Sequence, residues 1–327
     1  MKVIHDGDHG GDDFVATLVA LGMPDLIDLL GVTTCYGNAP VEQAAHNACS
    51  ALEMARRCDV PVSIGSAAPW KITRPAGDDA FGGNGLGGVE IPTPTKLPIP
   101  EPAHEWLVRC IRSATEPVTL CVTGPMTNVA ILLTEHPECV SRIARIVAMG
   151  GCLDPLGPAA RRGNITPHSE FNFFMDPDAA DFVLRSEVPL ALLPMDVTHQ
   201  LVFTPERRQQ ALDRWGNGDG FKLVQMLSAV ESLDRANFAL PGAVIHDLNV
   251  FVWLAASELY SFTSIPVGVE TDPDSERRGT LKRIVGSHPV EIATRLHDPD
   301  AAFEIVLESV SRSLGKSPDR ELQSDFP

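Results

Sequence analysis

Residues 6–13 of the chain read Asp6-Gly7-Asp8-His9-Gly10-Gly11-Asp12-Asp13. This acidic segment follows a short apolar run, Val3-Ile4, that predicts a strand, and it leads into residues 12–21, whose pattern predicts a helix ending at Gly22. Four carboxylates fall within eight residues. Each neighbouring pair repels by roughly 1 kcal/mol at about 4 Å in water and by about 4 kcal/mol at an effective dielectric near 20. The segment therefore favours a hard, oxygen-seeking cation.

Outward from this segment, short apolar runs alternate with amphipathic stretches, which is the pattern of a sheet with helices on its faces. We expect further strands over residues 29–34, 60–64, 118–122, 143–149 and 188–193. We expect helices over residues 41–58, 104–113, 126–133, 246–259 and 298–314, one starting at Asp176, and others between residues 205 and 233. Residues 262–293 predict short strands, and the Pro- and Gly-rich segment 69–102 predicts a functional or flexible loop.

The predicted fold class is α/β, with a single open, mostly parallel but mixed sheet flanked by helices. No repeat or long linker divides residues 1–327, so we expect one domain.

Composition narrows the classes of partner. The formal net charge of -17 disfavours nucleic acid and anionic membranes as partners. The chain has no apolar run long enough to span a bilayer and no signal-peptide pattern after Met1, so we expect a cytoplasmic protein. Seven scattered cysteines without a CxxC pair predict reduced core residues.

Polar residues follow several of the predicted strands. Open α/β sheets bind ligands beyond the carboxyl ends of their strands, so these residues are candidates for one site. They are Asn38, Thr123 with its backbone carbonyl, the loop residues Asn164, Glu170 and Asn172, and the pair His246-Asp247. Taken singly, each has a structural alternative: Asp12 and Asp13 could merely cap a helix, the polar loop could be a solvated surface, and a lone histidine is usually structural.

Together these segments resemble the inosine-uridine preferring nucleoside hydrolase family over nearly the whole chain. Residues 6–13 match the family's Asp-x-Asp-x-Gly-x-Asp-Asp fingerprint in order. The family's later segments follow as Gly-Asn at 37–38, Thr-Gly-Pro-x-Thr-Asn at 123–128, Met-Gly-Gly at 149–151, Asn-x5-Glu-x-Asn at 164–172 and His-Asp at 246–247. Two positions depart from the pattern, because His9 replaces the usual proline and Gly7 replaces a small polar or thiol residue.

The resemblance implies a Rossmann-like nucleoside hydrolase fold and a nucleoside N-ribohydrolase. Such an enzyme hydrolyses the N-glycosidic bond of purine or pyrimidine ribonucleosides, or both, to free base and ribose with a Ca²⁺-bound water. The implied Ca²⁺ ligands are Asp8, Asp13, the Thr123 carbonyl and Asp247. Asp8 is also the implied general base, and His246 is the implied general acid for the departing base.

By the same resemblance, a set of polar residues surrounds the ribose, where their negative field stabilises an oxocarbenium-like transition state. These residues are Asp12, Asn38, Asn164, Glu170, Asn172 and Asp247. Family likeness also implies a homodimer or homotetramer.

Two other functions stay open at the level of sequence. In a haloacid-dehalogenase-like phosphatase, Asp6 would be the nucleophile, but that site also needs a later basic residue and an acidic pair that cannot be placed convincingly. A non-catalytic nucleoside- or ribose-binding protein would keep the same acidic segment.

Overall fold

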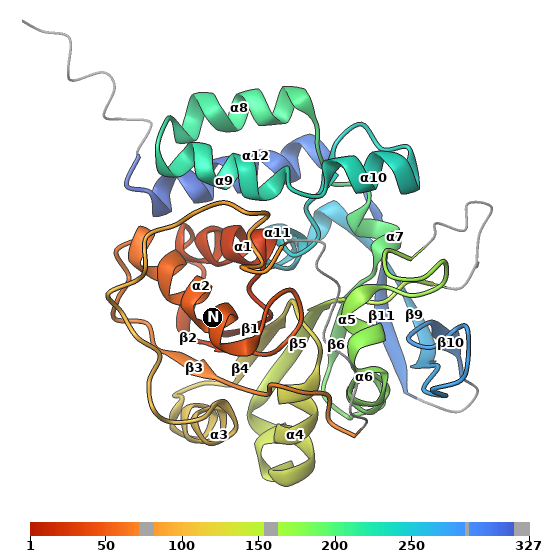
Figure 1. The fold of residues 1–327 in the computed structure, drawn as a ribbon. Coiled ribbons are helices and arrows are strands. Elements are labelled where there is room, and N and C mark those ends of the chain that lie inside the picture. The colour runs from red at the N-terminus through yellow and green to blue at the C-terminus, as the bar shows by residue number, and fades with distance from the viewer. Residues whose placement is uncertain (72–81, 154–162, 285–287, 317–327) are drawn as a thin grey trace, which may run out of the picture.

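A mixed sheet runs through the computed structural model, which describes residues 1–71, 82–153, 163–284 and 288–316 (Figure 1). Within these residues the sheet has nine strands in the order β10-β9-β11-β6-β5-β4-β1-β2-β3. Its strands are β1 (Lys2–Gly7), β2 (Asp28–Thr34), β3 (Val62–Ile64), β4 (Val118–Val122), β5 (Ile143–Met149), β6 (Leu190–Leu193), β9 (Tyr260–Val269), β10 (Leu281–Arg283) and β11 (Pro289–Leu296). The predicted open, mostly parallel α/β sheet is confirmed.

Strand direction changes only at one edge of the sheet. Strands β1 to β6 and β11 are parallel, whereas β9 runs antiparallel to both β11 and β10. The segment predicted to hold short strands therefore forms this edge, although β9 is ten residues long. A separate antiparallel pair, β7 (Val202–Phe203) with β8 (Ala243–Val244), was not predicted.

Helices cover both faces of the sheet (Figure 1). One apolar core contains residues of α1 (Gly11–Leu21), α2 (Val41–Met54), α8 (Pro205–Trp215), α9 (Asp219–Leu227), α11 (Leu248–Ala255) and α12 (Pro299–Ser313). The other core contains residues of α3 (Ala103–Ser113), α4 (Thr127–Glu135) and α6 (Pro177–Leu184). Shorter helical elements are α5 (Phe171–Met175), α7 (Met195–Thr198), α10 (Glu231–Phe238), and the 3₁₀ turns η1 (Pro137–Arg142) and η2 (Ser257–Leu259).

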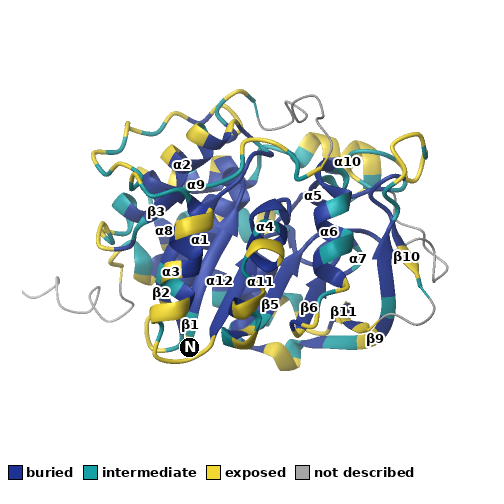
Figure 2. Cartoon of the chain, turned by 90° about the horizontal axis from the view of Figure 1, so that it is seen from below, coloured by how far each residue is buried: buried dark blue, intermediate teal, exposed yellow. Residues whose placement is uncertain are grey.

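Strand β4 shows why this sequence needs helices on both sides. Every residue of the strand is buried, as expected of a central parallel strand. Because side chains alternate along a strand, Leu120 and Val122 enter one core and Cys121 enters the other. Figure 2 shows the result, with dark-blue strands between helices whose exposed residues face outward.

Several element boundaries differ from those predicted. The predicted helix over residues 246–259 begins only at Leu248, with Asp247 as its N-cap, and gives way to a 3₁₀ turn at Ser257. In the predicted loop over residues 69–102, residues 72–81 lie outside the described part, and the rest contains no helix. Asn84 tightens that loop by donating to the Val89 carbonyl, 3.0 Å away, and accepting from the Leu86 N–H at 3.0 Å.

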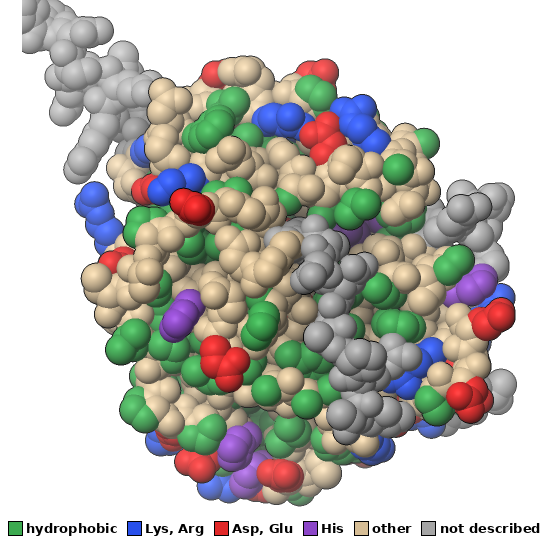
Figure 3. Space-filling model, in the orientation of Figure 1, with side chains coloured by type: hydrophobic (Ala, Val, Ile, Leu, Met, Phe, Trp, Pro, Cys, Tyr) green, Lys and Arg blue, Asp and Glu red, His purple; other side chains and the backbone are tan. Residues whose placement is uncertain are grey.

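Figure 3 shows one face of the molecule. On the side shown in Figure 3, basic and acidic side chains are scattered and lie close to one another among neutral atoms. Among the described helices, none is both long and apolar enough to cross a membrane.

Candidate active site

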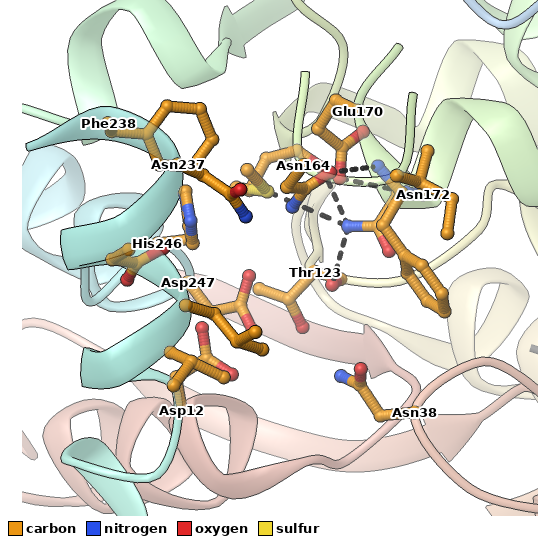
Figure 4. Close-up of a pocket in the computed structure, with 16 residues that line it drawn as sticks. Asp12, Asn38, Thr123, Asn164, Glu170, Asn172, Asn237, Phe238, His246 and Asp247 are labelled. Atoms are coloured by element: carbon orange, nitrogen blue, oxygen red, sulfur yellow. Dashed lines mark hydrogen bonds between the residues drawn. The ribbon is translucent and has the colours of Figure 1, made fainter. Parts of the chain in front are cut away.

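A cavity of about 200 Å³ opens beyond the carboxyl ends of the central parallel strands (Figure 4). Sequence-predicted residues make up half of its lining and come from the acidic segment, the ends of β2 and β4, the polar loop and the start of α11. They are Asp12, Asn38, Thr123, Asn164, Glu170, Asn172, His246 and Asp247. The fold therefore brings together residues that are far apart in the chain.

Buried carboxylates form the floor of this cavity. Carboxylate oxygens of Asp12, Asp13 and Asp247 all lie within 4.8 Å of one another, and none of the three side chains is more than 8% exposed. Burial raises the pKa of Asp12 to about 7, with repulsion from Asp13 adding to the shift. Burial also raises the pKa of Asp247 well above its ordinary value, again reinforced by Asp12 and Asp13. This floor is costly to ionise without a counter-cation.

Asp8 adjoins the cluster but has its own partners. Its two carboxylate oxygens accept hydrogen bonds from the backbone N–H and side-chain amide of Asn38, at 2.9 and 3.0 Å. Burial raises its pKa well above the ordinary value, and repulsion from Asp13 adds to the effect. Asn38 thus orients Asp8 as well as lining the cavity, a contact that its place in the sequence did not indicate.

Thr123 connects the floor to the polar wall. Its hydroxyl donates to Asp13 Oδ1 at 2.5 Å, and its backbone carbonyl accepts from Asn172 Nδ2 at 3.0 Å. The second oxygen of Asp13 accepts from the Gly10 N–H at 3.0 Å. Asp6 does not line the cavity. It accepts hydrogen bonds from Thr33 Oγ1 at 2.5 Å and from Asn128 Nδ2 at 2.8 Å.

This donor set suits a hard divalent cation. It contains only carboxylate and carbonyl oxygens, which calcium and magnesium prefer, and no thiolate or imidazole among the clustered groups. The raised pKa values of Asp8, Asp12 and Asp247 agree with this assignment, because a bound cation would relieve the repulsion that opposes their ionisation.

The polar wall contains a short helix where a loop was predicted. Glu170 is the N-cap of α5, and its carboxylate accepts from the N–H groups of Gly151, Asn172 and Phe173 at 2.7, 2.8 and 3.1 Å. Asn164 Oδ1 accepts from the Phe171 N–H at 2.9 Å. Burial raises the pKa of Glu170 to about 7. Both side chains therefore shape the wall by holding its backbone.

His246 lies on the opposite side of the cavity from this wall (Figure 4). Its Nδ1 lies 2.7 Å from the Thr198 hydroxyl, so the other ring nitrogen is left to face a ligand. Burial lowers the pKa of His246 to about 4, so the ring is neutral near pH 7.

Helix α10 supplies a wall that the sequence analysis missed. Its residues and the one before it add both apolar and polar groups to the cavity: Val230, Leu233, Asp234, Asn237 and Phe238. The predicted helical region ended at residue 233, whereas α10 continues to Phe238. The available signal was the helical spacing of Val230, Leu233 and Phe238, at i, i+3 and i+8, but which residues lie across the cavity from this helix depends on the tertiary fold.

Comparison with known proteins gives a consistent result. The family model of the inosine-uridine preferring nucleoside hydrolases matches residues 3–307. The pyrimidine-specific ribonucleoside hydrolase RihA of Enterobacter sp. is 37% identical over 274 residues, 83% of this chain and 84% of that protein. An uncharacterised protein of Schizosaccharomyces pombe is 33% identical over 319 residues, 95% of this chain and 99% of that protein.

Among solved structures, the purine-preferring ribonucleoside hydrolase of Gardnerella vaginalis superposes with a TM-score of 0.86 at 28% identity. That match covers 97% of this chain and 99% of the other. An α/β enzyme with an acidic pocket at its strand ends is the class that fold and site define. The chain belongs to the inosine-uridine preferring nucleoside hydrolase family.

Membership of this family makes the protein a hydrolase of N-glycosyl bonds. The phosphatase and the non-catalytic binding protein considered from the sequence are not favoured, because the family match and the structural neighbours all lie among nucleoside hydrolases.

The acidic floor predicts that calcium stabilises the protein more as pH rises. A carboxylate whose folded pKa is raised gives stability at low pH that is lost as pH rises through that value, which is about 7 for Asp12. A cation replaces the lost protons, so the increase in Tm caused by excess Ca²⁺ should grow between about pH 5 and pH 8. At about 100 times Kd the stabilisation is about 2.7 kcal/mol.

Thermal unfolding of chelator-treated protein, with and without Ca²⁺ at each pH, measures this increase. Comparing the two samples at one pH cancels the opposite contribution of buried neutral histidines. A calcium-induced shift that is zero, or that shrinks as pH rises, would contradict the assignment of the floor as a cation site.

Proposed function

We propose that the protein is a Ca²⁺-dependent ribonucleoside hydrolase that releases ribose and a free base. In this reaction a water oxygen bonds to C1′ of ribose, the C1′–N bond breaks, and its electron pair leaves with the base. The observation that carries the proposal is the group of three carboxylates within 4.8 Å at the floor of a cavity whose walls bear amides and His246.

The ligands proposed for the cation are Asp8, Asp13, Asp247 and the backbone carbonyl of Thr123. Asp12 belongs to the same cluster of oxygens and lines the cavity, which supports its proposed role in binding the sugar. When bound, a divalent cation lowers the pKa of a coordinated water and makes it a nucleophile near neutral pH.

Asp8 is the proposed general base. Its hydrogen bonds from Asn38 hold both carboxylate oxygens in place, which favours one fixed direction for accepting the proton of the attacking water. Asp6 supports the site from behind by fixing Thr33 and Asn128 rather than by reaching the cavity.

The ribose lies, in this proposal, between the acidic floor and the polar wall. Its hydroxyl groups would meet the side chains of Asp12, Asn38, Asn164, Glu170, Asn172 and Asp247. The transition state of glycosidic cleavage carries positive charge on the sugar ring, whereas the substrate is neutral. A field of fixed carboxylates therefore stabilises the transition state more than the substrate, and this difference accelerates the reaction.

His246 is the proposed general acid. Its Nδ1 is occupied by Thr198, so Nε2 is the atom that would reach the departing base. Burial keeps the ring neutral before the reaction, but negative charge developing on the base raises the proton affinity of its neighbour. The ring can then take up a proton from solvent and pass it through Nε2 to the base as the C1′–N bond breaks, while the proton that Asp8 accepts from the attacking water returns to solvent.

The preferred base is not fixed by the comparisons, because one relative is named pyrimidine-specific and another purine-preferring. We therefore propose ribonucleosides as the substrate class. A single domain over residues 1–327, a homodimer or homotetramer and a cytoplasmic location stay predictions.

Ribose release from a panel of purine and pyrimidine ribonucleosides tests the function. The wild-type protein with Ca²⁺ should release reducing sugar from at least one of them, and Asp8→Ala should lower kcat by about 10³-fold because the general base is lost. Asp25→Ala, which removes an exposed aspartate remote from the cavity lining, is the matched control and should retain wild-type activity. Saturable nucleoside binding without sugar release would contradict the proposal.

A second experiment separates the role of His246 from general damage. His246→Ala should lower kcat on inosine by about 10²-fold but should change hydrolysis of p-nitrophenyl riboside by less than about fivefold. The difference arises because p-nitrophenolate leaves without a proton. Equal losses on both substrates would argue against His246 as the acid.

A further inference from the structure

A buried series of hydrogen bonds runs behind the carboxylate floor, on the side away from the cavity. His5 Nε2 lies 2.8 Å from Thr123 Oγ1, which in turn donates to Asp13 Oδ1 at 2.5 Å. On the other edge of the ring, His5 Nδ1 lies 3.1 Å from Thr17 Oγ1. All four side chains are at most 1% exposed, so solvent does not compete for these contacts.

Chemistry fixes the direction of the first two bonds. As a cation ligand Asp13 is ionised and accepts only, so the Thr123 hydroxyl must donate its single proton to that carboxylate. The Thr123 oxygen can then accept only from a protonated His5 Nε2. Burial lowers the pKa of His5, so the ring is neutral and its Nδ1 is an acceptor. The remaining partner of Nδ1, the Thr17 hydroxyl, is therefore its donor.

The Thr17 hydroxyl has further neighbours that hold it in place. It also donates to the Asp13 carbonyl oxygen, one turn earlier in α1, at 3.1 Å, so its single proton is shared between that oxygen and His5 Nδ1, and it lies 3.3 Å from His9 Nε2. The rings of His5 and His9 are 4.9 Å apart, and Phe251 packs edge-on against His5 at 5.0 Å. The imidazole of His5 is thus confined on several sides.

Thr123 makes this arrangement important for the site. Its hydroxyl orients Asp13, and its backbone carbonyl is the uncharged ligand in the proposed cation site. A shift of this one residue would therefore move two proposed ligands together. His5 is the only residue among the described hydrogen bonds that donates to the Thr123 hydroxyl.

Both departures from the family's fingerprint lie at this network. At Gly7 a Cβ atom would stand 2.5 Å from Asp13 Oδ1 and 2.5 Å from Thr123 Oγ1, so a side chain there would push between them. His9 has φ of +35°, in the left-handed region, which proline cannot adopt. Gly7 therefore leaves room for the hydrogen bonds that join His5, Thr123 and Asp13. His9 adds a ring contact to His5.

We propose that His5 is a positioning residue of the cation site, which it acts on through Thr123 while Thr17 fixes its tautomer. The inference rests on the proposed function, because it takes Asp13 and the Thr123 carbonyl as ligands. Residues that orient ligands from behind typically change metal affinity by about 10- to 100-fold when altered. The expected effect is thus on affinity for Ca²⁺.

Calorimetric titration of chelator-stripped full-length protein with Ca²⁺ alone tests the inference. Thr17→Val keeps the shape of the side chain but removes its hydrogen bonds to His5 and to the Asp13 carbonyl, and it should raise the Kd for Ca²⁺ by about tenfold or more. Thr17→Ser restores the hydroxyl and should bring Kd back to within about threefold of wild type. Thr119→Val is the matched control. Thr119 is also buried and lies on β4, the strand that ends just before Thr123. Its side chain makes no hydrogen bond to a described residue in the structure.

Wild-type Kd in a folded Thr17→Val protein would overturn the inference, as would an equal loss in Thr119→Val. His5→Gln and His5→Leu leave the hydrogen bond from Thr17 to the Asp13 carbonyl in place, so they separate the role of His5 from a direct effect on Asp13, and they replace Thr17→Val if that variant does not fold. Glutamine can still donate to Thr123, so it should bind Ca²⁺ more tightly than leucine does, and equal affinities would count against the proposal. Failure of the wild-type protein to bind Ca²⁺ or to release ribose would instead mark failure of the proposed function.

Discussion

Repulsion among buried carboxylates is the constraint on which the rest of this structure depends. Asp12, Asp13 and Asp247 place oxygens within 4.8 Å of one another, and all three residues are largely buried. Each pair of charges at about 4 Å costs about 4 kcal/mol even at an effective dielectric near 20. Protons can relieve this cost, as the raised pKa of Asp247 reflects, but a divalent cation relieves it while keeping the site ionised. The parallel sheet makes this arrangement possible because the carboxyl ends of its strands lie at the same edge of the sheet.

The cavity above this floor is chemically asymmetric. One side carries carboxylates and amides, which suit the hydroxyls and developing charge of a sugar, and the other carries His246 and the apolar side chains of Leu233 and Phe238 on α10. A nucleoside has the same asymmetry, with a polar ribose joined to a flat base. In our proposal the bond that breaks lies where these two halves of the cavity meet. Hydrogen bonds fix side chains within each side, because Asn38 holds Asp8, Thr198 holds His246 and the Gly151 N–H holds Glu170.

Sequence reasoning predicted most of the sheet and half of the residues that line the cavity, for reasons that differ between elements. Strands such as β4 are continuous apolar runs bounded by turns, which leave little ambiguity. Helix α5 was missed because five residues are too short for periodicity, and only the cap at Glu170 makes it a helix. The contacts of Asn38 with Asp8 and of Thr198 with His246 depend on tertiary placement, which residue spacing does not encode.

The most direct test of the account is anomalous diffraction from crystals soaked in Mn²⁺, used as a scattering substitute for Ca²⁺. The account predicts one strong peak at the floor of the cavity, bounded by Asp8, Asp13, Asp247 and the Thr123 carbonyl. Absence of a peak at this position in crystals shown to contain the metal, or a peak only elsewhere on the protein, would contradict it.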